Sequence, residues 1–242
     1  MTQALVSAII PFHNAAPYLE EAVRSVLDQT YRPIEVLLVS DGAAATGVDI
    51  AQRLVAEHGE LRFLGLPDNR GPAAARNRGL ADAAGAFVTF LDADDCMMRD
   101  RVATQVAYLT DRPEVDVVLG AEELIVELDA PRGAARRGAL EEARPRFHTM
   151  SMMARRAAFE RVGPFDPEYR VAEDLDWLFR AAVGGLVIEK LDHVLTRHRL
   201  HADNLSYRTG EIRTAIIRSL RQRLVERRDN GHVAGHGRHS LL

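Results

Sequence analysis

The sequence is poor in several features that mark particular protein classes. Cys96 is its single cysteine, which excludes an intramolecular disulfide and a cysteine-rich zinc site and is compatible with a reducing compartment. No apolar run approaches the roughly 18 residues of a membrane span, and the first residues lack the basic start of a signal peptide. A formal charge of −4 gives no basic footprint for nucleic acid. We therefore expect a cytoplasmic protein with no transmembrane segment and no nucleic-acid partner.

What is present is a regular alternation of short apolar runs and amphipathic stretches. The chain has 242 residues and is 47% hydrophobic, which suits one large α/β domain. The pattern predicts strands at 4–10, 34–39, 61–66, 86–91 and 115–119, and helices at 17–29, 46–58, 71–84 and 99–110. This order is typical of βαβ units, so we predict a Rossmann-like, mostly parallel sheet flanked by helices.

The rhythm changes after residue 120. A stretch rich in Arg, Ala, Gly and Pro, residues 128–146, predicts a mobile surface loop. We expect strands at 147–153, 186–190 and 193–198, and helices at 155–161 and 172–183. The segment 210–229 predicts a basic amphipathic helix, and the Gly- and His-rich tail 230–242 is typical of disorder.

An acidic cluster follows the strand predicted at 86–91. Asp92, Asp94 and Asp95 crowd three carboxylates into four residues, and a hard divalent cation relieves their repulsion. Mn²⁺ or Mg²⁺ suits such oxygen ligands and would neutralise charge on a departing diphosphate. The alternative is that these residues merely cap the next helix.

Two helix starts carry further candidate residues. Gly71 and Pro72 open a helix whose free N–H groups suit phosphate, and Arg76 one turn later can pair with a diphosphate. Glu173 and Asp174 begin another helix, where one of them can deprotonate an acceptor hydroxyl. Each has a plainer explanation, as a solvated arginine or as carboxylates that favour any helix start.

His201 follows the last predicted strand. Its imidazole can complete a metal shell, or it can be an ordinary polar residue. Ligands of an open parallel sheet bind beyond the carboxyl ends of its strands, where His13, Asn14 and Asp41 also lie.

Five ordered blocks resemble the family-2 glycosyltransferases of the GT-A fold. They are SAIIPFHNAAPYLEEAVRSVLDQTY, IEVLLVSDG, NRGPAAARNRGLADAAGAFVTFLDADD, VGPFDPEYRVAEDLDWLFRA and RLHADNLS. The match covers roughly residues 5–206, most of the chain. It implies transfer of a sugar from a nucleoside-diphosphate donor, usually a UDP-sugar, to an acceptor hydroxyl by a metal-assisted, inverting single displacement.

The resemblance also implies roles for residues of this chain. Asp174 looks like the catalytic base, supported by Glu173, and Asp94 like the main metal ligand, with Asp92 and His201 beside it. The implied donor-binding residues are Pro11, His13, Asn14, Asp41, Asn69, Arg76 and Asp92. Residues 1–120 would then bind the nucleotide-sugar, and residues 121–209 would form the acceptor side of the same domain.

Some positions depart from the family pattern. Ala43, Ala44 and Ala45 replace the usual acidic and hydroxyl residues after Asp41, which puts the base and ribose preference in doubt. The acceptor, whether glycan, lipid, peptide or small metabolite, has no recognisable code in the sequence.

Two other functions stay open at this point. A sugar-nucleotide nucleotidylyltransferase has a similar sheet, but it requires a Gly-rich basic loop after the first strand. This chain has PFHNAAPYL there, which argues against that function. A non-catalytic relative would bind a nucleotide or a partner, and the helix at 211–228 would then dock on a protein or lie peripherally on an anionic membrane.

Overall fold

The computed structural model describes residues 3–130 and 146–229. Its strands are β1 (Val6–Phe12), β2 (Ile34–Asp41), β3 (Leu61–Leu66), β4 (Phe87–Phe90), β5 (Cys96–Met97), β6 (Val117–Val126), β7 (Arg146–Arg155) and β8 (Ile188–Leu200). Its helices are α1 (Leu19–Leu27), α2 (Ala45–Glu57), α3 (Pro72–Asp82), α4 (Arg101–Asp111), α6 (Arg156–Val162), α7 (Glu173–Val183) and α8 (Thr209–Asp229), with the 3₁₀ turn η1 (Leu205–Tyr207) before α8.

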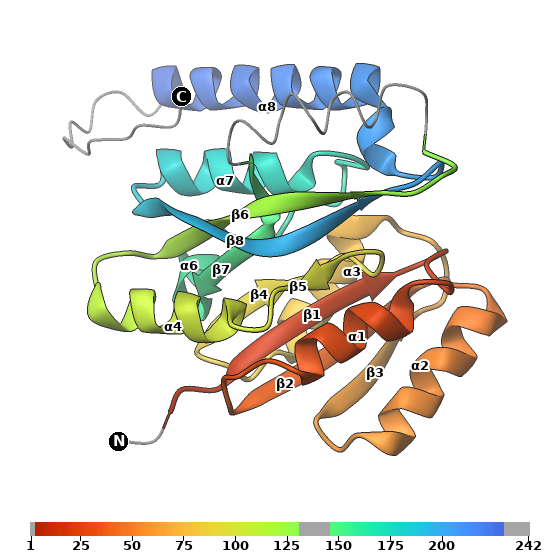
Figure 1. The fold of residues 1–242 in the computed structure, drawn as a ribbon. Helices are drawn as coiled ribbons and strands as arrows, with labels where there is room; N and C mark the ends of the chain where they lie inside the picture. The colour runs from red at the N-terminus through yellow and green to blue at the C-terminus, as the bar shows by residue number, and fades with distance from the viewer. Residues whose placement is uncertain (1–2, 131–145, 230–242) are drawn as a thin grey trace.

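All the strands form one sheet in the order β3-β2-β1-β4-β7-β6-β8-β5 (Figure 1). The first half, β3-β2-β1-β4, is parallel throughout, as the βαβ pattern predicts. In the second half β7 runs antiparallel to both β4 and β6, and β5 antiparallel to β8. The sheet is therefore mixed.

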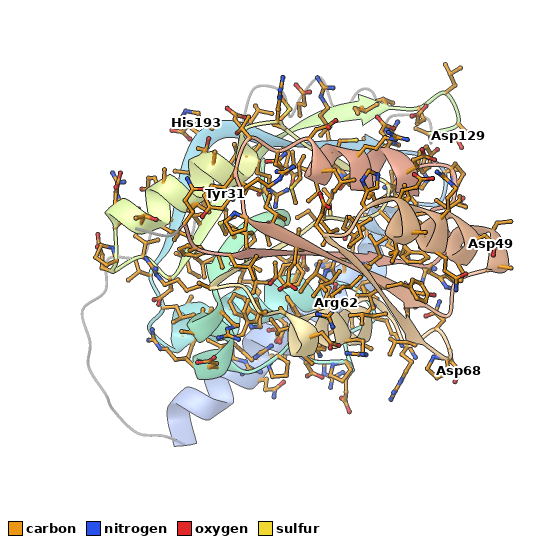
Figure 2. The ribbon with its side chains drawn as sticks, turned by 90° about the horizontal axis from the view of Figure 1, so that it is seen from below. Tyr31, Asp49, Arg62, Asp68, Asp129 and His193 are labelled. Carbon is orange, nitrogen blue, oxygen red and sulfur yellow. The ribbon has the colours of Figure 1, made fainter. Side chains whose placement is uncertain are left out.

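Alternation along the strands divides the core between the two faces of the sheet. In β1, Val6, Ala8 and Ile10 face one hydrophobic cluster, and Ile9 between them faces the other. Helices α1, α2 and α4 cover the first cluster, and α3, α6 and α7 cover the second. Charged side chains such as Asp49, Asp68 and Asp129 lie at the outer surface (Figure 2).

Several predicted elements differ from the observed ones. The two strands predicted at 186–190 and 193–198 are one continuous strand, β8, which pairs in parallel with β6 through two irregularities in register. The strand predicted at 115–119 continues to Val126. The short strand β5, which follows the acidic cluster, is not indicated by the hydrophobic pattern. Residues 131–145 of the predicted loop and the tail 230–242 lie outside the described residues.

Helix α8 packs on α7, on the side away from the sheet (Figure 1). The buried hydroxyl of Ser219 donates to the Asp176 carboxylate over 2.6 Å, and Asp176 also pairs with Arg180. Helix α8 is thus fixed to the domain by a buried polar contact, and its first turns stay beside the start of α7.

Candidate active site

The carboxyl ends of β1, β2 and β4 meet at one edge of the sheet, where a cavity of about 970 Å³ opens. Every residue to which the resemblance gives a role lines this cavity. They are Pro11, His13, Asn14, Asp41, Asn69, Arg76, Asp92, Asp94, Glu173, Asp174 and His201. Residues separated by up to 190 positions in the chain therefore share one space.

The acidic turn after β4 offers ligand atoms from Asp92, Asp94 and Asp95 that all lie within 4.8 Å of one another. Asp92 and Asp94 line the cavity, whereas Asp95 is buried behind them. Burial, opposed by Arg76 and assisted by the neighbouring carboxylates, raises the pKa of Asp92 to about 6. A cation bound here would relieve this repulsion.

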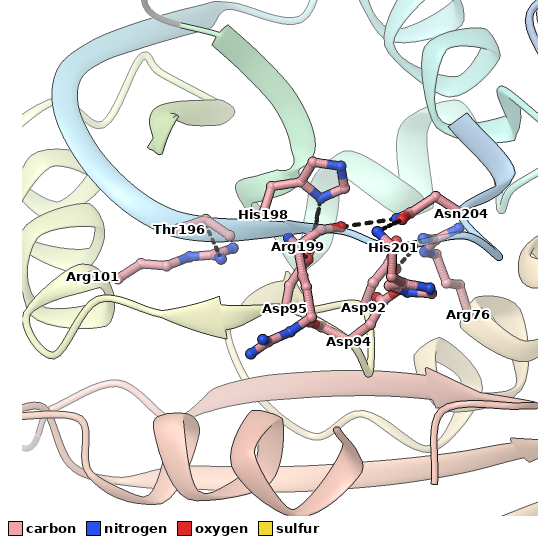
Figure 3. A network of polar contacts seen from close by, with 10 residues as sticks. All are labelled: Arg76, Asp92, Asp94, Asp95, Arg101, Thr196, His198, Arg199, His201 and Asn204. Atoms are coloured by element: carbon pink, nitrogen blue, oxygen red, sulfur yellow. Dashed lines mark hydrogen bonds and ion pairs between the residues drawn. The ribbon is translucent and has the colours of Figure 1, made fainter. Parts of the chain in front are cut away.

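The Asp95 carboxylate is already engaged by residues of β8. Its Oδ1 accepts the Arg199 N–H over 2.8 Å, and both its oxygens lie 3.1 Å from His198 Nδ1 (Figure 3). Burial alone would lower the pKa of His198, but Asp95 outweighs it and raises that pKa to about 9. We therefore assign Asp95 to holding the end of β8 against the acidic turn, which leaves Asp92 and Asp94 as the carboxylates that face the cavity and could hold a cation.

His201 lies against Asp94, with 2.9 Å between its Nε2 and Asp94 Oδ2. The hydrogen bond to Asp94 raises the pKa of His201. Asn204 holds the segment in place: its side chain accepts the His201 N–H and donates to the Arg199 carbonyl over 2.9 Å (Figure 3). The Tyr18 ring packs on the imidazole, with 5.2 Å between centroids. The imidazole is thus oriented before any ligand arrives.

Two carboxylates and one imidazole on the same cavity wall are a donor set that fits Mn²⁺ or Mg²⁺. The oxygen donors suit both hard cations, and the imidazole nitrogen favours Mn²⁺ of the two. In the structure Nε2 of His201 lies on Asp94 and Nδ1 accepts the Asp203 N–H over 3.3 Å, so a cation that takes Nε2 must displace its proton.

Arg76 connects the two walls of the cavity. Its Nη2 donates to Asp92 over 2.7 Å, and its Nη1 donates to Glu173 (Figure 3 shows the first contact). Burial opposes the charge of Arg76, but Asp92 and Glu173 outweigh burial and raise its pKa. The resemblance assigns Arg76 to the nucleotide alone, whereas the structure engages it with a carboxylate on each side; the guanidinium has donors left for a ligand.

Glu173 and Asp174 form the first turn of α7. The residue before them, Ala172, has φ 59°, the one positive φ of a non-glycine residue among those the structure describes. This left-handed conformation is costly for alanine and ends the preceding loop abruptly. Glu173 is buried, and burial raises its pKa to about 7 against the opposing effect of Arg76. Asp174 is half-buried and lines the cavity.

Asp41 ends β2 and supports the start of α3. Its two oxygens accept the N–H groups of Arg70 at 2.7 Å and Gly71 at 2.9 Å. Gly71 has φ 91°, and a Cβ there would meet the Arg170 side chain at 3.2 Å. His13 Nδ1 lies 2.8 Å from the Asp41 carbonyl oxygen. The Asp41 carboxylate, to which the resemblance gives a part in donor binding, thus also shapes the loop around that part of the cavity.

Sequence reasoning missed residues whose partners are remote in the chain. Apart from their position in or near the quoted blocks, no sequence pattern indicates a role for His198, Arg199, Asn204 or Tyr18. Arg101 is fully buried and donates to Thr196 over 2.8 Å and to Thr89 over 2.9 Å (Figure 3 draws the first). Burial lowers the pKa of Arg101 to about 9. An arginine in a helix ordinarily predicts a solvated position, so no sequence signal indicates this one.

The curled mixed sheet with helices on both faces is the fold of the GT-A glycosyltransferases. The family model described as Glycosyl transferase family 2 matches residues 7–163, and the chain belongs to this family. The family match favours the transferase over the nucleotidylyltransferase alternative.

Individual relatives agree with the family. An uncharacterized glycosyltransferase of Haemophilus influenzae is 37% identical over 109 residues, which are 45% of this chain and 44% of that protein. The mannosyltransferase PcManGT of Pyrobaculum calidifontis, solved with GDP-Man and Mn²⁺, has a TM-score of 0.69 and 26% identity over 96% of this chain and 66% of that one. TarS of S. aureus, solved with UDP-GlcNAc, has a TM-score of 0.67 and 22% identity over 82% of this chain and 59% of that one.

The chain spans less than half the length of the first relatives that it matches. Within the described residues, no helix combines the length and apolar character needed to cross a membrane.

Proposed function

We propose that this protein transfers a sugar from a nucleoside-diphosphate donor, a UDP-sugar in the first instance, to an acceptor hydroxyl with inversion at the anomeric carbon. The observation that carries the proposal is that one cavity contains both sets of groups. Asp94 and His201 line one side of it, and Asp174 lines the other. Solved relatives bound to UDP-GlcNAc and GDP-Man support the donor class and leave the base open.

Asp94, Asp92 and His201 would hold the Mn²⁺ or Mg²⁺ ion. The ion, when bound, supplies Lewis-acid stabilisation of the negative charge on the leaving diphosphate. Arg76 adds a fixed positive charge beside Asp92, in a space where burial strengthens electrostatic interactions.

Asp174 accepts the proton of the acceptor hydroxyl as that oxygen attacks the anomeric carbon. One base is sufficient for a single inversion, since no covalent sugar–enzyme intermediate has to be formed and resolved. Glu173, held by Arg76, fixes the first turn of α7 and so the direction of Asp174.

The donor's nucleoside would lie against Pro11, His13, Asn14, Asp41 and Asn69, which line the end of the cavity formed by β1, β2 and the loop before α3. The acceptor would enter from the side of α7 and α8. It is a glycan, a lipid, a peptide or a small metabolite.

A donor-turnover assay with named variants tests this mechanism. We expect Asp94→Asn and Asp174→Asn each to lower transfer by at least about two orders of magnitude, the usual scale for loss of an acid–base group. The control is Asp192→Asn, the same change at an exposed carboxylate of β8. EDTA should abolish turnover and Mn²⁺ restore it, and NMR of the product should report the inverted anomer.

Near wild-type transfer by Asp174→Asn would remove the base assignment. A wild-type protein that binds UDP but turns over no donor with Mn²⁺ would instead favour the non-catalytic relative.

We further propose that the protein works in the cytoplasm and touches the membrane peripherally through α8. Ile217 and Leu220 are 39% and 44% exposed on α8, next to the exposed Arg213 and Arg221. Apolar side chains between arginines match the chemistry of an anionic lipid surface.

A further inference from the structure

A second hollow of about 360 Å³ lies between the start of α8 and the segment before α7. It shares Arg170, Val171 and Glu211 with the large cavity, so the two spaces are contiguous. These three residues form the threshold between them. Asp174 lines the large cavity, so the second hollow adjoins the space that contains the proposed base.

Charged and hydroxyl-bearing residues supply much of the second hollow's lining, but most of the surface presented to it is carbon. Glu168 pairs with Arg218, whose guanidinium lies 5.1 Å from the centre of the Tyr169 ring. Arg170 and Glu211 at the threshold bring the lining to two carboxylates and two guanidinium groups. A sugar ring suits such a lining, because its C–H face can lie on the carbon surface while its hydroxyl groups bond to the charged groups at the edge.

Of the three threshold residues, Arg170 has the most side-chain hydrogen-bond donors. It is exposed, and within residues 3–130 and 146–229 it makes no hydrogen bond or ion pair. Its side chain lies across the cavity toward Gly71 at the start of α3. Its donors are thus available to a molecule passing from the large cavity into the second hollow.

Small side chains on α8 leave space in the second hollow for a bound molecule. Gly210 and Ala215 of α8 and Val171 opposite them line the second hollow. The contact between Ser219 and Asp176 holds α8 at this distance from α7, so the space is a fixed part of the fold.

We propose that the second hollow is an acceptor subsite that binds the sugar next to the one receiving the transferred unit, and that the acceptor is a glycan of at least two sugars. This inference rests on the proposed transferase function, because only that function puts the receiving sugar at Asp174.

The test compares acceptors of different length in one assay. Methyl glycosides of glucose, galactose, mannose and N-acetylglucosamine are offered with UDP- and GDP-sugars and Mn²⁺, beside disaccharides that end in the same sugars. We expect kcat/KM to be about tenfold or more higher for a disaccharide than for its terminal monosaccharide, the scale of one or two hydrogen bonds.

Filling the second hollow should remove that preference. Ala215→Trp places an indole in the space, and Thr214→Trp does so from a neighbouring position in case the first variant folds poorly. The matched control is Gln222→Trp, which adds the same ring to an exposed position of the same helix and should keep the preference. Hydrolysis of the donor by water, measured in every sample, reports the transferase chemistry separately.

Equal use of mono- and disaccharides by the wild type overturns the subsite. So does a preference that survives in both filled variants, or transfer only to lipid or peptide acceptors. In each of these cases continued donor hydrolysis leaves the proposed function standing. A wild type that turns over no donor contradicts the proposed function, and the subsite with it.

Discussion

At the scale of single residues, the site depends on carboxylates that have different tasks despite being neighbours. Asp94 faces the cavity and His201, whereas Asp95, the next residue, is buried and bonded to His198 and Arg199. Of these two adjacent aspartates, one thus lines the cavity and the other holds β8 in place. The division follows from which way each carboxylate faces at the turn, toward the cavity or toward β8.

The pair of His198 and Asp95 predicts a pH dependence of stability. The folded pKa of His198 is about 9, above the ordinary value of 6.5, so its contribution is complete below pH 6.5 and is lost as pH rises through 9. At about 1.4 kcal/mol per pKa unit, the free energy of unfolding should fall by roughly 3 kcal/mol at most over this range.

Urea unfolding from pH 6 to 10 in EDTA measures this fall. His198→Gln should flatten the curve between pH 6.5 and 9, while His193→Gln, at an exposed position of β8, should leave it as in the wild type. The assignment is wrong if the two variants give the same curve.

At the scale of elements, close packing of α3 on the sheet sets the position of Arg76. Gly79 lies where a Cβ would come within 2.6 Å of Ile9 Cγ2 and 3.2 Å of Val39 Cγ2. The helix therefore approaches β1 and β2 closely, and its first turns reach the cavity.

Gly79→Ala should destabilise the protein even though alanine is the better helix former. Overpacking costs roughly 1–3 kcal/mol and the helix gains roughly 0.5–1 kcal/mol, so we expect a net loss of about 1–2 kcal/mol in chemical unfolding. Gly210→Ala in α8, with nothing within 4 Å of the added Cβ, is the control and should be neutral or stabilising. A neutral Gly79→Ala would mean that α3 can move away from the sheet at little cost.

Helix α8 carries its own prediction. The wild type should sediment with vesicles that contain phosphatidylglycerol, and more weakly with pure phosphatidylcholine vesicles, because Arg213 and Arg221 flank the exposed apolar residues. The double change Ile217→Ser and Leu220→Ser should weaken binding roughly tenfold, since burying two apolar side chains contributes on the order of 1–3 kcal/mol.

Val183→Ser tests whether loss of any exposed apolar side chain weakens vesicle binding, or only loss of those on α8. Val183 is 42% exposed but belongs to α7, so its change should leave vesicle binding intact. A wild type that ignores anionic vesicles would remove the membrane proposal.

At the scale of the whole molecule, the cavity joins elements from both halves of the chain, so a ligand that fills it should stabilise the fold as a unit. We expect UDP and Mn²⁺ together to raise the midpoint of thermal unfolding more than either alone, with about 2.7 kcal/mol of stabilisation at a hundredfold excess over Kd. GDP in place of UDP compares the two bases directly.

Asp94→Asn separates the metal from the nucleotide in this experiment. The variant should lose the additional shift caused by Mn²⁺ and keep that of the nucleotide alone, and EDTA should have the same effect on the wild type. An equal Mn²⁺ effect in the variant would place the metal elsewhere.

The sequence by itself determined the parallel half of the sheet, most helices and the residues gathered at the edge. Apolar periodicity reports which face of an element is buried, and the ordered blocks carry the family. Only the tertiary structure decided how those residues are paired. Arg76 reaches Glu173 across 97 positions and His198 reaches Asp95 across 103, and the second hollow exists only because α8 rests on α7. Local patterns record burial but not the partner, because the partner is chosen by the packing of remote segments.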